Sequence, residues 1–230
     1  MRELYIFCEG ATEQGFSTQV LAPHLFPQCD GCIRTIKVAS SKHHGIVSRG
    51  GVVKYASLKR DIQNTLKSRS ERNIFFTTLI DLYGLPGEFP GKAGHVRDPD
   101  NPTLYVRALE NAFGNDVGDF RFIPHLQLHE YETMLFSEPD AFRISFDNCD
   151  DAVQALKGIV AALPSIEHID EGPQTAPSRR ITNVLPAYEG RKPSAGPDIA
   201  EYIGINGIRA KCPHFDQWLT RLENLKWYGA

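Results

Sequence analysis

Acidic side chains follow three of the strands that the sequence predicts. The strands are expected over residues 4–8, 73–80 and 120–128, and the acids that follow them are Glu9, Asp81, Glu130 and Glu132. Ligands of an open parallel sheet gather outside the carboxyl ends of its strands, so these acids are expected to meet at one edge. Crowded carboxylates repel one another unless a cation lies among them, and oxygen ligands suit Mg²⁺ or Mn²⁺. Such an ion would polarise a phosphoryl oxygen and activate water for hydrolysis.

Each acid also has a structural interpretation that involves no metal. An acid after a strand often caps a helix or forms a turn, and only the coincidence of three strand ends favours a metal site. His129 lies three residues before Glu132, so the two could share a helix face as a metal pair. The alternative for His129 is a hydrogen-bonded structural role beside the strand end. The stretch 129–132 reads HEYE rather than HExxH, which excludes a zinc-protease motif.

Two basic groups could hold phosphates. They comprise Lys42, His43, His44 and Arg49 in the first group, and Arg179, Arg180 and Lys192 in the second. The first lies in a polar, glycine-rich loop over 40–51 that lacks the GK[ST] ending of a P-loop. A lysine near a metal–phosphate site can offset charge on the pentavalent phosphorane. Both groups could equally be solvated loops.

Charged residues are segregated along the chain. Residues 34–72 carry ten Lys and Arg against two acids, and residues 129–171 carry ten acids against two basic residues. The formal net charge of −3 disfavours tight, non-specific nucleic-acid binding. The two segments nevertheless suit a phosphate-rich polymer and a divalent cation. The alternative is two solvated helical faces of opposite sign.

The composition is that of a soluble globular protein. The 230 residues are 41% hydrophobic and 23% charged, which excludes a disordered, collagenous or coiled-coil chain. No run reaches the ~18 apolar residues of a membrane span, and the first residues do not resemble a signal peptide. We therefore expect a cytoplasmic protein without a membrane partner. The five cysteines are expected to be reduced thiols, because Cys29 and Cys32 form a CxxC without a second pair for zinc.

Strand and helix patterns alternate over the first 150 residues. Continuous apolar runs predict buried parallel strands, and apolar residues at helical spacing predict an amphipathic helix over 52–68. The alternation predicts an α/β fold with a three-layer, mostly parallel sheet flanked by helices. We expect a core domain over 1–150 and a helical C-terminal extension over 151–230 packed on it.

Local signals place the helix starts and one weak strand. Thr12 is the expected N-cap of a helix over 14–26, which Pro23 would bend or end. Pro124 weakens the strand over 120–128 or moves it to an edge. Gly196, Pro197 and Asp198 are expected to open another helix.

The motifs resemble a bacterial family. The similar segments are EGATE after the strand over 4–8, TTLIDLYGLPGEFPG at the end of the strand over 73–80, and FIPHLQLHEYETMLF, which starts within the strand over 120–128; together they resemble domain-of-unknown-function family 4276. The ending APSRRI…AYEGRK…IAEYIGINGIRAKCPHFDQWLTRL also looks like that family, so the resemblance covers nearly the whole chain. That family in turn is similar to the TOPRIM fold, which is Rossmann-like, of topoisomerases, primases and OLD-type nucleases, and to RloB-like proteins.

This resemblance implies an acidic site that binds Mg²⁺ and nucleic-acid phosphates. Glu9 matches the first-strand glutamate, an acid/base or metal ligand, and Glu13 matches the second acid of the EGxxE pattern. Asp81 matches the first aspartate of a DxD pair. The matches to the later acid are Glu130 or Glu132, and the match to the late lysine is Lys192. Tyr83 stands where the second aspartate of DxD is expected, which weakens a two-metal mechanism.

Two functions from different classes follow. The first is a Mg²⁺-dependent nuclease that hydrolyses phosphodiester bonds in DNA or RNA. Its metal ligands would be Glu9, Asp81 and Glu130 or Glu132, and it would act as an effector in bacterial phage defence. The alternative is a non-catalytic subunit that uses the same fold to bind nucleic acid or an ABC- or AAA-type ATPase. A weaker third interpretation is a phosphotransferase or phosphatase acting on a small nucleotide.

Overall fold

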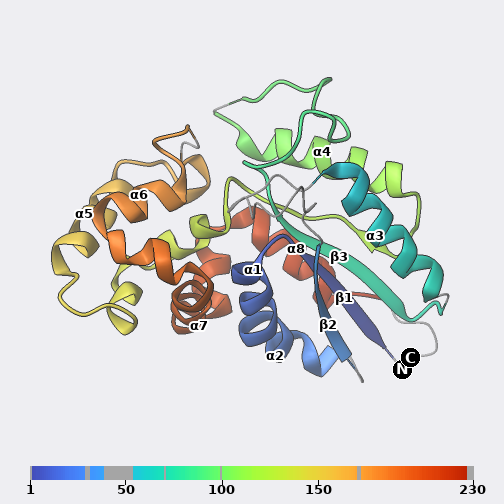
Figure 1. Cartoon of the computed structure of the whole chain (residues 1–230), viewed down its shortest axis with the longest axis horizontal. Coiled ribbons are helices and arrows are strands. Elements are labelled where there is room, and N and C mark those ends of the chain that lie inside the picture. Colours follow the sequence, from blue (N-terminus) through green and yellow to red (C-terminus); the bar gives the residue numbers. More distant parts are fainter. Residues whose placement is uncertain are drawn as a thin grey trace, which may run out of the picture.

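A parallel sheet forms the centre of the protein (Figure 1). The computed structural model describes residues 2–28, 32–38, 54–69, 71–98, 100–169 and 172–226. The strands are β1 (Glu3–Cys8), β2 (Cys32–Lys37), β3 (Ile74–Asp81), β4 (Phe122–Ile123) and β5 (Leu126–Gln127). The α-helices are α1 (Ala11–Phe16), α2 (Ala22–Leu25), α3 (Tyr55–Ser68), α4 (Pro102–Val117), α5 (Asp150–Ala161), α6 (Pro177–Val184), α7 (Lys192–Lys211) and α8 (Pro213–Glu223).

The expected α/β fold is confirmed. The strand order is β2-β1-β3-β4, β5 continues beside β3, and the described strand pairs are parallel. Strand β1 lies between β2 and β3 and is buried along its whole length, which explains its continuous apolar sequence. Cys8 at its end pairs with Lys37 on one side and with Leu79 on the other. The ends of β1 and β3 therefore meet at one edge of the sheet.

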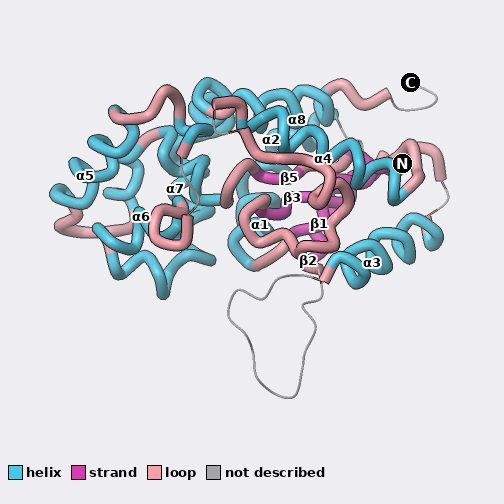
Figure 2. Tube along the Cα trace, turned by 90° about the horizontal axis from the view of Figure 1, so that it is seen from above, coloured by secondary structure: helices cyan, strands magenta, loops and turns pink. Residues whose placement is uncertain are grey.

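Helices cover both faces of the sheet. Side chains along a strand alternate between faces, so Leu4 and Ile6 pack in one hydrophobic cluster while Tyr5 and Phe7 pack in another. The first cluster joins the sheet to α1, α5, α7 and α8, and the second joins it to α3 and α4. Figure 2 shows β5, β3, β1 and β2 side by side between these layers. The result is a three-layer arrangement.

Proline interrupts the predicted strand over 120–128. The chain pairs with β3 as β4, leaves it at Pro124, and returns as β5, so the single strand was wrong. Where the backbone pairing with β3 is interrupted at Pro124, threonine side chains of β3 provide hydrogen bonds instead. Thr77 Oγ1 donates to the carbonyl of Ile123 (2.7 Å), and Thr78 Oγ1 both donates to the carbonyl of His125 (2.7 Å) and accepts from its N–H (3.0 Å). His125 is thereby fixed at the break.

Helix α1 starts earlier than predicted. Gly10, not Thr12, is the N-cap, and the carboxylate of Glu13 accepts a hydrogen bond from the Gly10 N–H at 2.8 Å. The prediction chose a hydroxyl cap, but here the acid three residues later satisfies the free N–H. Pro23 does not end the helix, because it lies in the first turn of α2, where its missing N–H costs nothing.

The C-terminal helices serve different parts of the fold. Helices α5, α6 and α7 lie together at one end of the molecule, whereas α8 lies against the sheet (Figures 1 and 2). Helix α7 begins at Lys192, so the predicted start at Gly196 was wrong; Pro197 lies inside it, and Gly204 bends it with a positive φ of 74°. On α8, Trp218 Nε1 donates to Thr77 Oγ1 at 2.8 Å across 141 residues of sequence.

The loop after β3 is fixed to the core by an aromatic side chain. Phe89 lies edge-on to Tyr55 of α3 and to Phe113 of α4, with ring centroids 5.2 and 5.1 Å apart. Burial of these rings holds the loop over the second hydrophobic cluster. Tyr83, at the other end of the loop, is 41% exposed.

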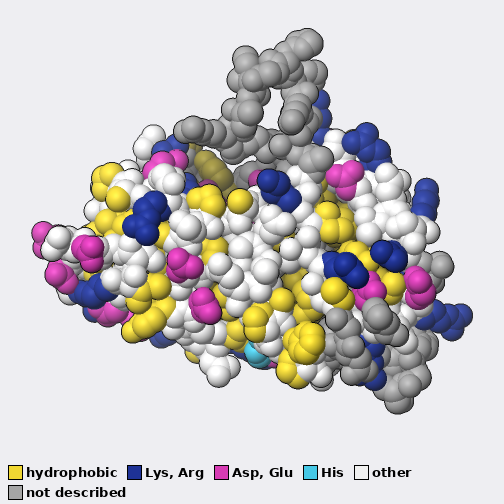
Figure 3. All heavy atoms as spheres, turned by 60° about the horizontal axis from the view of Figure 1, so that its bottom comes forward, with side chains coloured by type: hydrophobic (Ala, Val, Ile, Leu, Met, Phe, Trp, Pro, Cys, Tyr) yellow, Lys and Arg dark blue, Asp and Glu magenta, His cyan; other side chains and the backbone are white. Residues whose placement is uncertain are grey.

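Surface charges mix on the face shown in Figure 3. Basic and acidic side chains lie interspersed there rather than gathered by sign.

No helix in the described part of the chain has both the length and the apolar character that crossing a bilayer requires. The four cysteines within the described residues, Cys8, Cys32, Cys149 and Cys212, have free thiols, and Cys29 lies outside the description.

Candidate metal and phosphate site

Glu9 connects the ends of the two central strands. Its N–H continues the β1–β3 ladder by donating to the carbonyl of Leu79, and its Oε2 accepts from the N–H of Asp81 at 3.1 Å. Asp81 in turn uses Oδ1 to accept from the N–H of Tyr131 at 2.8 Å. This chain of contacts ties the ends of β1 and β3 to the segment that carries Glu130 and Glu132. The parallel register thus brings three acidic motifs to one edge.

Hydrogen bonds also position the other acids, from backbone N–H groups to Glu13 and Glu130 and from a tyrosine hydroxyl to Glu132. Glu130 Oε2 accepts from the N–H of Ser178, in the first turn of α6, at 2.8 Å. Glu13 holds Gly10 through Oε2, and Glu132 Oε1 accepts from the Tyr188 hydroxyl at 3.3 Å. At Glu9, Asp81 and Glu130 the other carboxylate oxygen has no hydrogen bond to the described residues, whereas the carboxylates of Glu13 and Glu132 also interact with their own backbone N–H groups. We call Glu9, Glu13, Asp81, Glu130 and Glu132 the acidic edge.

Burial and mutual repulsion raise the pKa values at the acidic edge. Burial, followed by the charges of Glu13 and Glu130, raises the pKa of Glu9 to about 7, against the opposing N–H of Asp81. Burial, followed by the charge of Glu130, raises the pKa of Glu132 to about 8, although Lys192 opposes the shift. Burial, then the charges of the other four acids, raises the pKa of Asp81 well above its usual value. The five carboxyl groups therefore act electrostatically as one site.

No basic side chain neutralises this cluster directly. In the ranges that the structure describes, none of the five acids forms an ion pair with lysine or arginine. Lys192 is close enough to lower the pKa of Glu132, but its ammonium pairs with Glu189 at 3.1 Å. Uncompensated carboxylates in a partly buried site bind a cation favourably, because the cation removes their repulsion.

The donor set fits Mg²⁺ or Mn²⁺ better than a softer ion. It consists of carboxylate oxygens without cysteine or histidine. No three of the five acids bring ligand oxygens within 4.8 Å of one another, since the single such group found among the described residues is Glu110, His125 and His214. Mg²⁺ retains several water ligands and commonly contacts one or two carboxylates, so an ion held partly through water suits this wider spacing.

His129 does not belong to a metal pair. Its Nε2 lies 2.9 Å from the carbonyl oxygen of Glu167, and its backbone has a positive φ of 64°. The positive φ turns the chain between β5 and the 3₁₀ helix Tyr131–Ser137, so His129 and Glu132 do not share one helix face. The structural interpretation of His129 is the one that these contacts support.

The two predicted basic groups differ in what the structure describes. Lys42, His43, His44 and Arg49 lie outside the described residues. Arg179 is exposed on α6, one residue after Ser178, and Arg180 Nε donates to the carbonyl of Thr175 at 2.6 Å. The first turn of α6 thus connects Glu130 with a basic surface.

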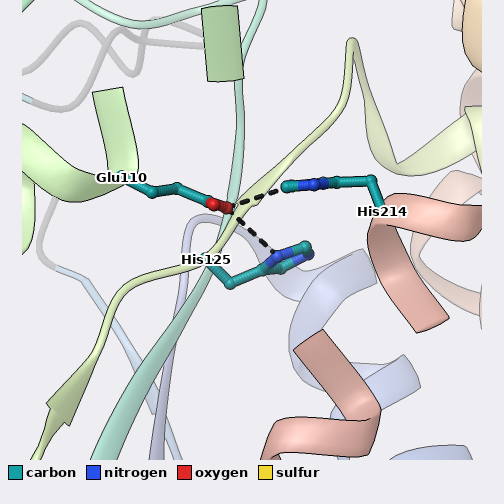
Figure 4. A group of neighbouring side chains, drawn as sticks. All are labelled: Glu110, His125 and His214. Carbon is teal, nitrogen blue, oxygen red and sulfur yellow. Dashed lines mark hydrogen bonds and ion pairs between the residues drawn. The ribbon is translucent and has the colours of Figure 1, made fainter. Parts of the chain in front are cut away.

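A second cluster of metal-type side chains was not predicted from the sequence. Glu110 of α4, His125 between β4 and β5, and His214 of α8 place ligand atoms within 4.8 Å of one another (Figure 4). The three residues come from distant segments and match no short motif, so spacing alone does not reveal them. The signal available was the polar His125 beside Pro124 in an otherwise apolar stretch.

Comparisons with known proteins identify the family of this chain. The C-terminal region of the Burkholderia pseudomallei OLD protein is similar in structure, with a TM-score of 0.46 and 14% identity over 97% of this chain and 99% of that chain. None of the curated proteins matches the sequence significantly. The pattern of the domain of unknown function DUF4276 matches residues 8–223. The protein therefore belongs to the DUF4276 family.

Proposed function

We propose that the acidic edge binds Mg²⁺ or Mn²⁺ and hydrolyses phosphodiester bonds in nucleic acid. The observation that carries the proposal is the convergence of five carboxyl groups from three sequence motifs at one end of the sheet, without a lysine or arginine paired to any of them in the described structure. A fold that merely needed stability would not concentrate like charges in this way, because their repulsion costs free energy.

Four of the acids are proposed as metal ligands: Glu9, Asp81, Glu130 and Glu132. When bound, the ion would neutralise the carboxylates, polarise a phosphoryl oxygen and lower the pKa of a bound water. Backbone N–H bonds hold one oxygen of Glu9, Asp81 and Glu130 and leave the other for an incoming ligand. This arrangement fixes the carboxylates before metal and substrate arrive.

Glu9 and Glu13 are the candidates for proton transfer. The pKa of Glu9, which burial and its acidic neighbours raise to about 7, suits a group that gains and loses a proton near neutral pH. Burial also raises the pKa of Glu13, whose Oε2 is held at Gly10. One of them would accept a proton from the attacking water, and the carboxyl that forms could return it to the leaving oxygen.

The basic residues would hold the phosphate backbone. Lys192 lies near Glu132, and Arg179 lies one residue beyond the N–H that binds Glu130. With Arg180, and with Lys42, His43, His44 and Arg49 from the loop outside the description, these residues would bind phosphates without reading base sequence. The substrate in this proposal is DNA or RNA, and a role as a phage-defence effector is consistent with it.

Cleavage assays test the proposal directly. The purified protein is incubated with labelled single- and double-stranded DNA and RNA, with Mg²⁺, with Mn²⁺, or with a chelator. We expect cleavage of at least one substrate with either metal and none with the chelator, because the carboxylates need the ion to approach a phosphate. Failure to cut any substrate, or cutting that persists in the chelator, contradicts the proposed mechanism.

Two observations favour a non-catalytic second candidate. Tyr83 replaces the second acid after β3, and the acidic edge lacks three ligand oxygens within 4.8 Å of one another. A subunit that binds nucleic acid or an ATPase would tolerate this looser geometry, since it need not align water with a phosphate. Nucleic-acid binding that depends on Mg²⁺, without cleavage under any condition, would favour this candidate over the nuclease.

Metal-free protein is expected to lose stability as pH rises. The pKa values of Glu9 and Glu132 are about 7 and about 8, above their ordinary value of 4.5, so the fold favours the protonated carboxyls. Their contribution is fully present below pH 4.5 and is lost as the pH passes through 7 and 8. Because Mg²⁺ binds only the ionised form, it should raise the Tm more at pH 8 than at pH 5.

Thermal unfolding followed by circular dichroism provides the measurement. The matched variant is Glu132→Gln, which removes one of the two titrations and should reduce the difference between the two pH values. An equal effect of Mg²⁺ on the Tm at pH 5 and pH 8 would show that these carboxyls do not hold the ion.

A further inference from the structure

Glu110, His125 and His214 converge where three elements meet. Glu110 Oε1 lies 3.4 Å from His125 Nδ1 and 3.0 Å from His214 Nε2, and both rings point toward it (Figure 4). Metal–ligand bonds of about 2.0–2.1 Å in a tetrahedral site place neighbouring ligand atoms about 3.3 Å apart. The two distances from Glu110 Oε1 therefore resemble the spacing of ligands around one ion, and the two imidazole nitrogens lie within 4.8 Å of each other.

Packing fixes the orientation of both imidazoles. His125 stacks on Trp218 of α8, with ring centroids 4.1 Å apart and planes 9° apart, and it stacks on His214 at 5.1 Å. Glu110 Oε1 also accepts a hydrogen bond from the N–H of Leu126 at 2.8 Å. The ligand side chains are thus held before binding, which lowers the entropic cost of forming a metal site.

His125 is buried without the hydrogen bonds that its ring requires. The residue is fully buried, and neither Nδ1 nor Nε2 has a hydrogen-bond partner, because the 3.4 Å approach of Glu110 lacks hydrogen-bond geometry. A buried imidazole nitrogen without a partner costs free energy. An ion between the three side chains would give Nδ1 a ligand bond in place of the missing hydrogen bond.

The protonation states of His125 and Glu110 also suit metal ligation. Burial lowers the pKa of His125 to about 4, so its ring is neutral and keeps a lone pair at neutral pH. For Glu110, burial opposes ionisation, but the neighbouring side chains of His125 and His214 prevail and lower its pKa to about 2. A neutral imidazole and an ionised carboxylate are the forms that bind metal. Burial favours the neutral ring of His214 as well, but the hydrogen bond to Glu110 and the charges of Glu110 and Glu167 prevail and raise its pKa, so a bound ion would displace a proton from that ring.

Space for a fourth ligand adjoins the cluster. A cavity of about 250 Å³ is lined by the three side chains together with Arg107, Gln217 and Arg221. Two imidazoles and one carboxylate with an open position are typical of a site for a divalent transition ion such as Zn²⁺, whereas Mg²⁺ prefers oxygen ligands throughout.

We propose that Glu110, His125 and His214 form a Zn²⁺ site. The site shares no residue with the acidic edge, and it joins α4, the β4–β5 connection and α8. The fourth position faces the cavity, where water or an anion attracted by Arg107 and Arg221 would complete the coordination. This site does not depend on the proposed hydrolysis.

Competition for Zn²⁺ tests the site. Metal-free full-length protein is titrated with Zn²⁺ against a chromogenic chelator, in excess Mg²⁺ to occupy the acidic edge. We expect one equivalent of Zn²⁺ bound by wild type, and an affinity lower by about 100-fold or more in His125→Gln and in Glu110→Gln. Co²⁺ in place of Zn²⁺ should give the visible absorption of a four-coordinate ion, which both variants lose.

Matched variants separate the two sites. Exposed His95 offers the control His95→Gln, which should bind Zn²⁺ as wild type does, and Asp81→Asn should also retain it. Circular dichroism verifies that each variant is folded, and Glu110→Gln serves if His125→Gln is not. Absence of a bound equivalent in wild type overturns the proposal, as does unchanged Zn²⁺ affinity in either folded variant.

Discussion

Asp81→Asn is expected to reduce metal-dependent cleavage of nucleic acid by about 10³-fold. Asp81 lies at the end of β3 among four other acids, and its pKa is raised first by burial and then by their charges. Asparagine keeps the shape of the side chain and an oxygen that can accept from the N–H of Tyr131. The variant therefore removes a charged metal ligand while leaving the contacts that position the segment.

The fold of this variant should be preserved or slightly strengthened. Loss of one negative charge relieves repulsion at the acidic edge, so the Tm without metal should be at least that of wild type, and the increase on adding Mg²⁺ should shrink. Asp147→Asn, at an exposed aspartate, makes the same chemical change elsewhere and should cleave normally. Cleavage by Asp81→Asn at the wild-type rate would remove Asp81 from the mechanism.

Arg121→Ala is expected to lower the free energy of unfolding by about 3 kcal/mol. The guanidinium is nearly buried; it donates to Asp119 at 2.7 and 3.0 Å, to the carbonyl of Leu66 at 3.2 Å and to that of Arg69. It also lies 5.4 Å from the ring centroid of Phe76 in β3. One side chain thus satisfies the C-terminal carbonyls of α3 and neutralises a carboxylate. Alanine would remove both contacts and leave Asp119 only the backbone N–H at position 121, at 2.9 Å.

Lysine should restore less than half of this loss, because one ammonium does not span the several acceptors that the planar guanidinium reaches. Urea unfolding provides the measurement. The control is Arg60→Ala on α3, whose side chain is 67% exposed and 4.0 Å from Asp61, and it should change stability by about 0.5 kcal/mol or less. Similar losses from Arg121→Ala and Arg60→Ala would show that the buried network contributes little.

The central part of the fold was predictable because its buried segments have simple sequence patterns. Strands β1 and β3 are covered on both faces, so most of their residues are apolar, and the buried Thr77 and Thr78 of β3 use their hydroxyls in hydrogen bonds. Helix α3 buries one face, and Tyr55, Leu58 and Ile62 recur at helical spacing. The edge at which Glu9 and Asp81 meet follows from the parallel order alone.

Other features depend on tertiary contacts that no local pattern records. The start of α1 depends on Glu13, which binds the N–H of Gly10. The interruption of the strand predicted over 120–128 depends on threonine side chains of β3, whose hydrogen bonds replace backbone pairing there. The cluster of Glu110, His125 and His214 exists only because α8 packs against the sheet beside α4. Sequence spacing carries no information about that packing.

The position of α8 has a consequence for synthesis of the protein. Trp218 and its neighbours on α8 complete the cluster that covers one face of the sheet, and Trp218 binds Thr77 across 141 residues. The ribosome synthesises β1 and β3 long before α8, because synthesis proceeds at about 5–20 residues per second. For several seconds the nascent sheet thus presents bare apolar surface, so ribosome-associated holdases should have their main opportunity in the interval before the last helix emerges.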